Sequence, residues 1–340
     1  MNGEGNDCEL GFEAYFEEKV IPLIAREHPE LVSEMSVRVE GSFGLGAGDE
    51  LSDLDVTLFL PEKLWKERGG QLQLTLLHKL EPFVAHPSSV FPRDPFVWWN
   101  LRHSEISVHR LSELLCGRAE SVLAGEREVP WEEVAVEELL QLQIHPVLRD
   151  GHKALARLRE LTSPERYPKR LWVKGLICEL VDLAGELEEF EKAVRRSKPL
   201  EAQMFLGEVV RMLFRAVFLT NRRYYPWRNG FLRMFKELPF GPKELGGEFE
   251  IVGSEASWPE KSAAVKRIVH TVTKQILESG MLTADMMKYL LHARNEKAWE
   301  NPNWLESAEA RGRQAEEAGY DSWYGWIWER WGWPEQGGVP

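Results

Sequence analysis

A stretch near the N-terminus, VEGSFGLGAGDELSDLDVTLF (39–59), constrains the fold of this chain more than any other part. It contains two apolar segments, 36–41 and 53–60, which we expect to form strands joined by a glycine-rich loop. Asp53 and Asp55 are separated by one residue, so on a strand both side chains project from the same face. Such close carboxylates repel each other unless a cation lies between them. The pair therefore predicts a divalent-cation site, and its oxygens suit Mg²⁺.

The Gly41-Ser42 pair follows the first expected strand directly and predicts a tight turn. Glycine leaves room for a phosphate group to approach the backbone, and the N–H groups of such a turn can bind phosphate oxygens. A phosphate-binding turn beside an Mg²⁺ site is the combination that nucleotidyl transfer requires.

The chain has 340 residues, enough for two domains. Strand and helix signals alternate in the first part, and helical spacing dominates the remainder. We therefore expect an α+β protein, with a mixed β-sheet domain at 1–130 followed by an all-helical domain at 131–340. Expected helices besides these strands are 10–26, 61–80, 112–123, 132–161, 170–196, 200–219, 259–279 and 283–297, with a further strand at 104–111.

The net charge of −13 argues against a nucleic-acid partner, because such binding depends on Lys and Arg neutralising phosphates. It favours a cationic or neutral small molecule, or a protein. No apolar run is long enough to span a bilayer, and the N-terminal segment lacks the layout of a signal peptide. Three widely spaced cysteines, Cys8, Cys116 and Cys178, offer no zinc site and fit a reducing compartment. We expect a cytoplasmic protein without a membrane partner.

Gly41-Ser42, ten intervening residues and then Asp53-Leu54-Asp55-Val56 resemble the signature of the DNA polymerase β-like nucleotidyltransferase superfamily. Ser52 before the Asp pair, and Asn221 to Pro226 in the helical half, are similar to its small-molecule branch, which includes aminoglycoside adenylyltransferases. The resemblance covers the first third of the chain. It implies that Asp53 and Asp55 bind Mg²⁺ and that Gly41 and Ser42 hold the phosphates of a nucleoside triphosphate, with ATP as the leading case.

The superfamily also uses a third carboxylate on a later strand, and Glu105 in SEISVHRL is the best candidate. On that strand Ile106 and Val108 face one way, which leaves Glu105, Ser107 and His109 on the other face. Glu105 would either draw the proton from the acceptor hydroxyl or bind a second metal ion. Its rival is Asp94, which lies between two prolines and so in a loop. His109 is four residues from Glu105, about 13 Å along a strand, and is expected to be a wall residue.

Basic and aromatic residues in the helical half are candidates for nucleotide binding. Arg170 and Lys174 share one face of a helix, and Arg228 lies in an aromatic turn. Each of these residues either reaches the phosphates or forms part of a solvated surface. Tyr224 in the same turn either stacks on the base or packs in a core.

The segment from Trp323 to Trp333 holds five tryptophans in eleven positions. It either binds a base, a sugar or a cation, or it forms a hydrophobic clasp or a subunit contact. The second interpretation leaves a homo-oligomer open.

The leading functional hypothesis is an Mg²⁺-dependent enzyme that moves a nucleoside monophosphate, AMP from ATP, to a hydroxyl of a small molecule or protein. One alternative is a synthase of signalling nucleotides or a tRNA nucleotidyltransferase. Another is a partner-controlled module of the same fold, such as a toxin or antitoxin. Fold does not determine the acceptor, so these alternatives stay open.

Overall fold

The computed structural model divides the chain into two compact units, unit 1 at Met1–Arg166 and unit 2 at Tyr167–Pro340. The sequence-based boundary lies at 130/131 and the structural division at 166/167. Among the described residues no helix is both long and apolar enough to cross a membrane. The structure describes residues 13–48, 54–80, 106–227, 230–283, 286–287, 290, 294 and 297–300.

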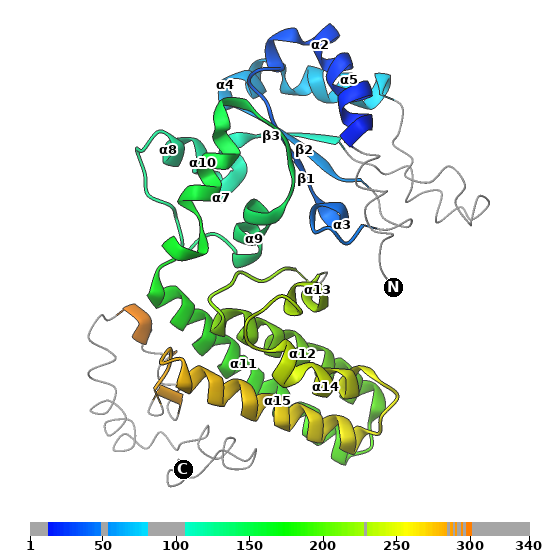
Figure 1. Ribbon diagram of the computed structural model, residues 1–340, viewed down its shortest axis with the longest axis vertical. Coiled ribbons are helices and arrows are strands. Elements are labelled where there is room, and N and C mark those ends of the chain that lie inside the picture. The colour runs from blue at the N-terminus through cyan, green and yellow to red at the C-terminus, as the bar shows by residue number, and fades with distance from the viewer. Residues whose placement is uncertain are drawn as a thin grey trace, which may run out of the picture. The chain divides into compact units, whose positions relative to one another are not determined.

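Unit 1 is a mixed α/β structure built on a four-stranded sheet with the order β3-β2-β1-β4 (Figure 1). β1 pairs antiparallel with both β2 and β4, and β2 pairs parallel with β3. A register shift interrupts the β1–β4 pairing between Val37 and Arg38. Three of these strands confirm the sequence-based prediction. The strands are β1 (Ser36–Val39), β2 (Val56–Leu60), β3 (Ile106–Arg110) and β4 (Val147–Asp150).

One face of the sheet is apolar and carries the core of unit 1. Val37, Leu58 and Leu60 are fully buried there, and they pack with residues of α2 and α5. Alternate residues of a strand share a face, so this core uses every second position. The other positions of β1 and β2, such as Arg38 and Thr57, face the opposite side of the sheet and are buried as well. The helices concerned are a π-helical turn (Phe16–Val20), α2 (Ile21–Glu27) and α5 (Gly70–Lys79).

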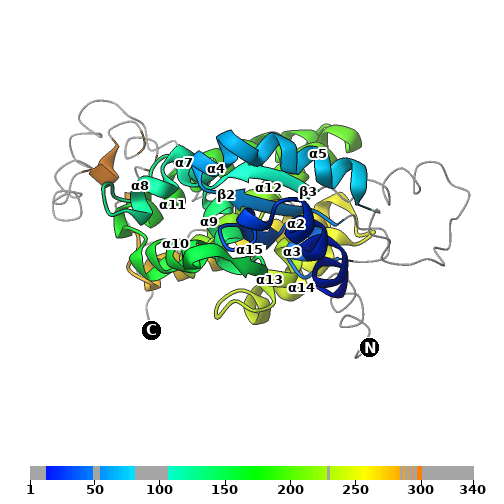
Figure 2. The ribbon, with the colours of Figure 1, turned by 90° about the horizontal axis from the view of Figure 1, so that it is seen from above.

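Helix α5 also covers the edge strand β3, as Figure 2 shows from above. The Gln73 side chain accepts a hydrogen bond from Val108 N at 2.8 Å and donates one to Ile106 O at 2.9 Å. These bonds satisfy backbone groups that an edge strand otherwise leaves unpaired. The predicted helix at 61–80 is confirmed as α4 (Glu62–Leu64), a π-helical turn (Trp65–Gly69) and α5.

The predicted helix at 132–161 is wrong in its middle. Pro146 cannot continue a helix, and β4 begins at the next residue and pairs with β1. The helix expected at 112–123 is likewise divided, because Leu115 and Cys116 both have φ of 54°. The short helices here are α7 (Leu114–Gly117), α8 (Ala119–Leu123), α9 (Val136–Ile144) and α10 (Ala154–Leu161).

The regular secondary structure of unit 2 is all helical within its described residues, which agrees with the expectation for the second half. Helices α11 and α12 form a hairpin that turns at Ser197, where φ is 54°. Their facing apolar residues, such as Leu180 and Leu213, are buried. The predicted helices at 170–196, 200–219 and 259–279 are confirmed. The helices are α11 (Lys169–Arg195), α12 (Pro199–Thr220), α13 (Phe231–Phe235), α14 (Pro242–Gly253) and α15 (Trp258–Glu278).

Candidate functional site

The structure brings Gly41 and Asp55 into direct contact at the end of β1. Gly41 has φ of +59°, in the left-handed region that favours glycine. A Cβ atom at this position would lie 2.5 Å from Asp55 Oδ2. The expected turn is the start of a short helix, α3 (Gly41–Gly44). Only a glycine at position 41 therefore lets the carboxylate lie against the turn.

The backbone ties the same two segments together. Glu40 N donates a hydrogen bond to Asp55 O at 2.7 Å, one position beyond the last β1–β2 pair, Val39 with Val56. Asp55 consequently lies directly before β2, rather than inside the strand as the sequence suggested. The half-buried Ser42 follows Gly41 in α3, and its carbonyl accepts from Ala47 N at 2.8 Å.

The polar face of the sheet is arranged in rows across the strands. The register pairs Arg38 with Thr57, and Thr57 with Ser107. The next row along β2 and β3 pairs Phe59 with His109. The predicted face of β3 is confirmed, because Ser107 and His109 line the same cavity as Asp55. Successive rows on one face are about 7 Å apart by strand rise.

A cavity of about 530 Å³ lies over these rows. Besides the strand residues, Leu114 of α7 and Glu138 of α9 line it, so the polar face is covered by different helices from the apolar face. The lining contains four carboxylates and one guanidinium group, which makes the cavity acidic. The carboxylates belong to Glu40, Asp55, Glu113 and Glu138, and the guanidinium group to Arg38.

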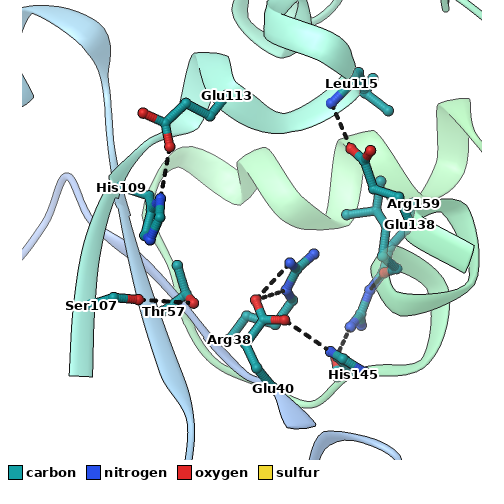
Figure 3. A network of polar contacts seen from close by, with 11 residues as sticks. Arg38, Glu40, Thr57, Ser107, His109, Glu113, Leu115, Glu138, His145 and Arg159 are labelled. Carbon is teal, nitrogen blue, oxygen red and sulfur yellow. Dashed lines mark hydrogen bonds and ion pairs between the residues drawn. The ribbon is translucent and has the colours of Figure 1, made fainter. Parts of the chain in front are cut away.

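The buried Arg38 and the half-buried Glu40 form an ion pair on the wall of the cavity (Figure 3). Arg38 Nη2 and Nε lie 2.6 Å and 2.9 Å from Glu40 Oε1, and the guanidinium carbon lies 5.1 Å from the centre of the Phe59 ring. On the other side, His145 Nδ1 lies 3.5 Å from Glu40 Oε2, which is long for a hydrogen bond.

These neighbours determine the ionisation of the cluster. Burial by itself raises the pKa of Glu40, but the contact with His145 and the charge of Arg38 outweigh it and hold the pKa at about 2. Burial, together with the charges of Arg38 and Arg159, lowers the pKa of His145 more than the Glu40 carboxylate raises it. At neutral pH we therefore treat Glu40 as ionised and His145 as neutral.

Two further carboxylates of the cavity are held in place by hydrogen bonds. Glu113 Oε2 lies 2.7 Å from His109 Nδ1, which fixes the orientation of that ring. Burial raises the pKa of Glu113, but hydrogen bonds from Arg110 and His109 outweigh it, and the net pKa is lowered. Glu138 Oε1 accepts from Leu115 N at 2.9 Å, at the left-handed residues that divide α7.

Other predicted site residues belong to unit 2. Arg170 is exposed on α11, and Lys174 Nζ of the same helix lies 5.7 Å from the centre of the Trp299 ring. Tyr224 is 2% exposed and stacks on Trp172 with ring centres 5.5 Å apart. Of the two predicted roles for Tyr224, this position corresponds to core packing.

The Asn221 side chain closes the aromatic turn that sequence analysis singled out. Its Oδ1 accepts from Phe240 N at 3.0 Å, and its Nδ2 donates to Phe240 O at 3.0 Å. The turn is thereby joined to the residue directly before Gly241, at the start of α14.

Several predicted residues lie outside the described residues: Asp53, Asp94, Glu105, Arg228 and the segment 323–333. Within the described part, no group of three His, Cys, Asp or Glu side chains could hold a metal ion. Asp55 is therefore the one member of the predicted metal-binding set that the structure describes.

Sequence analysis missed several polar residues of the cavity and of the cluster behind it, among them Arg38, Glu40, Glu138 and His145. Arg38 and Glu40 carry a signal, because two charged residues alternate with buried Val37 and Val39 along a strand. Glu138 lies in an ordinary amphipathic helix, and His145 ends it. Neither has a local signal that distinguishes it.

A domain of unknown function, DUF4037, matches residues 131–229. The matched region runs from α9 in unit 1 through α11 and α12 of unit 2. It includes Glu138 and His145 but not the Gly41–Asp55 contact. No curated protein matches the chain.

Proposed function

We propose that this protein is an Mg²⁺-dependent nucleotidyltransferase that moves a nucleoside monophosphate, AMP from ATP, to a hydroxyl of a small molecule or protein. The observation that carries the proposal is the contact between Gly41 and Asp55, a residue that also lines a polar cavity. At Gly41 the turn has no space for a side chain, and a carboxylate lies directly against it. A metal–triphosphate complex requires both parts, because the turn binds the phosphates and the carboxylate binds the metal ion.

The sheet register supports the predicted third carboxylate. Val56 pairs with Ile106, and these residues directly follow Asp55 and Glu105 in sequence. Asp55 and Glu105 are therefore the residues directly before one paired position of β2 and β3, which supports Glu105 as the predicted third carboxylate. Glu105 and Asp53 themselves lie outside the described residues.

The available ligands fit Mg²⁺, because carboxylate oxygens are the hard donors that this cation prefers. Asp53, Asp55 and Glu105 would hold it, and the bound cation would neutralise charge on the triphosphate and on the leaving pyrophosphate. The Ser42 hydroxyl and the N–H groups of the turn would bind the phosphates. Glu105 would accept the proton of the attacking hydroxyl.

The cavity is the natural place for the acceptor. Asp55 contacts Gly41 and directly precedes β2, whose residues Thr57 and Phe59 line the cavity together with Asp55. In-line displacement requires the attacking oxygen opposite the leaving pyrophosphate. With the pyrophosphate at the Gly41-Ser42 turn, the acceptor would approach from the cavity. Its excess of carboxylates favours a neutral or cationic acceptor over an anionic one.

Label transfer tests the proposal directly. The full chain is incubated with Mg²⁺ and ATP labelled at the α-phosphate, in separate reactions with aminoglycosides, a protein mixture and tRNA. Label should appear on one acceptor, and ATP labelled at the γ-phosphate should leave it unlabelled. Label from the γ-phosphate would instead indicate a phosphotransferase. Absence of both Mg²⁺-dependent ATP binding and transfer would refute the proposal.

A further inference from the structure

Behind the Gly41-Ser42 turn lies a cluster of buried polar atoms that are poorly satisfied. Arg38 Nη1 and both ring nitrogens of His145 have no hydrogen-bond partner within the described part of the chain. Arg38 is 4% exposed and His145 is 1% exposed. An unpaired buried polar group costs about 1–3 kcal/mol, and native proteins contain few of them. Stability alone therefore does not account for this cluster.

Glu40 connects the cluster to the candidate site. Its side chain bonds Arg38 through Oε1 and lies 3.5 Å from His145 through Oε2. Its backbone N–H donates to Asp55 O at 2.7 Å, and its carbonyl accepts from Gly44 N at 2.8 Å. Glu40 is thus bonded both to the turn and to the backbone of Asp55.

His145 supports the turn by a second contact. Its ring carbons lie 3.1 Å from the place where a Cβ on Gly44 would be, so the ring packs against the last residue of α3. Arg159 of α10 fixes His145 in turn, because its Nη2 donates to the His145 carbonyl and its Nε to Leu142 O at 2.8 Å. Figure 3 shows this chain of contacts from Arg159 through His145 to Glu40 and Arg38.

We infer that Glu40 and His145 are positioning residues, which hold the Gly41-Ser42 turn and Asp55 in the arrangement that binds a nucleoside triphosphate. This inference rests on the proposed function. Neither residue takes part in the chemical step. Their contribution is a turn whose backbone is ordered before the phosphates arrive, which reduces the entropy lost on binding.

A positioning role and a purely structural role predict different outcomes for His145→Leu. Leucine fills a similar volume and removes two unpaired nitrogens, so thermal stability should stay equal or rise. The affinity for Mg²⁺-ATP should fall by about tenfold, because the turn loses the support of the imidazole ring and more of its ordering then has to occur on binding. A purely structural residue would instead lower stability and affinity together.

The conservative variant His145→Asn provides the rescue. An asparagine amide nitrogen can occupy the place of Nδ1 and donate to Glu40, so the affinity for Mg²⁺-ATP should stay within about threefold of wild type. Glu34→Gln is the matched control. Glu34 Oε2 contacts His152 Nε2 at 2.9 Å in unit 1, and none of its recorded contacts involves the turn.

Three measurements on the full chain decide the inference: calorimetric titration with Mg²⁺-ATP, thermal melting, and hydrogen exchange of residues 36–48 without nucleotide. We expect His145→Leu to weaken binding and to accelerate exchange in this segment while melting no earlier than wild type. Glu34→Gln should change none of the three.

Unchanged affinity, unchanged exchange, or a parallel loss of melting temperature and affinity in His145→Leu would overturn the inference. So would failure of this variant to fold. If wild-type protein does not bind Mg²⁺-ATP, the proposed function fails, whereas the exchange comparison still decides whether His145 orders the turn.

Discussion

In β2, Leu58 and Leu60 are fully buried in the apolar core, whereas Thr57, together with Asp55 directly before the strand, lines the cavity on the other face of the sheet. The apolar face is densely packed against α2 and α5. The polar face carries the ion pair of buried Arg38 with half-buried Glu40, nitrogens without hydrogen-bond partners, and a cavity of about 530 Å³.

This difference separates stability from chemistry within one sheet. The apolar face contributes the free energy of folding through burial. The polar face includes arrangements that cost stability, and such features concentrate at functional sites. Substitutions on the two faces should therefore affect different measurements.

The largest effect should come from Asp55→Asn on the polar face. Loss of the carboxylate charge removes a metal ligand, so transfer of labelled AMP should fall by at least about 10³-fold, or about 4 kcal/mol in the activation barrier. The free energy of unfolding should change by less than about 0.5 kcal/mol, because the substitution is isosteric. Urea denaturation and the label-transfer assay measure the two quantities. Retained transfer would remove Asp55 from the proposed metal site.

The second effect should come from Leu58→Ala on the apolar face. Leu58 is 0% exposed, so truncation leaves a cavity and should reduce the free energy of unfolding by about 3 kcal/mol. The folded fraction should keep its affinity for Mg²⁺-ATP. The control is Leu74→Ala on α5, where the residue is 57% exposed and the expected change is below about 0.5 kcal/mol. If Leu58→Ala weakens nucleotide binding more than it destabilises the fold, the two faces are not independent.

The alternation that defines these faces is also what the sequence predicts best. Ser107 and His109 were placed on the face of β3 opposite Ile106 and Val108, and the structure agrees. The prediction succeeds because strand alternation is a local property of consecutive residues. Gly41 and Asp55 were likewise placed together through the turn that joins their strands.

Strand β4 was not predictable in the same way. Val147–Asp150 is short and follows a helical stretch, and its strand conformation depends on pairing with β1, more than 100 residues earlier. His145 enters the cluster beside Glu40 through the same long-range pairing. Sequence patterns contain the alternation within a strand, but not which distant segment packs against its end.

The third effect is a pH dependence that originates on the polar face. The folded-state pKa of Glu40, about 2, lies below the ordinary value of 4.5. Its contribution to stability is therefore complete above about pH 4.5 and is lost as the pH falls towards 2. The pKa of His145 is also lowered in the folded state, so this residue too reduces the stability of the fold as the pH falls below its ordinary value of 6.5.

The comparison of wild type with Glu40→Gln isolates this contribution, since the other carboxylates titrate in both proteins. The difference in unfolding free energy between wild type and Glu40→Gln should shrink by about 2 kcal/mol from about pH 6 to about pH 3. The charged or titratable groups next to Glu40 are Arg38, His145 and, behind His145, Arg159. Urea denaturation at each pH measures it. A difference that is constant with pH would contradict the low pKa.

The smallest effect should come from Thr57→Val in the middle row of the polar face. Thr57 Oγ1 lies 3.3 Å from Ser107 Oγ, and both side chains line the cavity. Valine keeps the shape and leaves Ser107 able to bind water, so stability should change by less than about 0.5 kcal/mol.

A hydroxyl that orients the acceptor before reaction contributes equally to the bound and transition states, so KM for the acceptor should rise about threefold with kcat unchanged. Steady-state transfer to the labelled acceptor measures both constants, with Ser33→Ala at an exposed serine as the control. A fall in kcat at constant KM would mean that Thr57 acts in the chemical step, and the reactive part of the polar face would then extend beyond the row of Asp55.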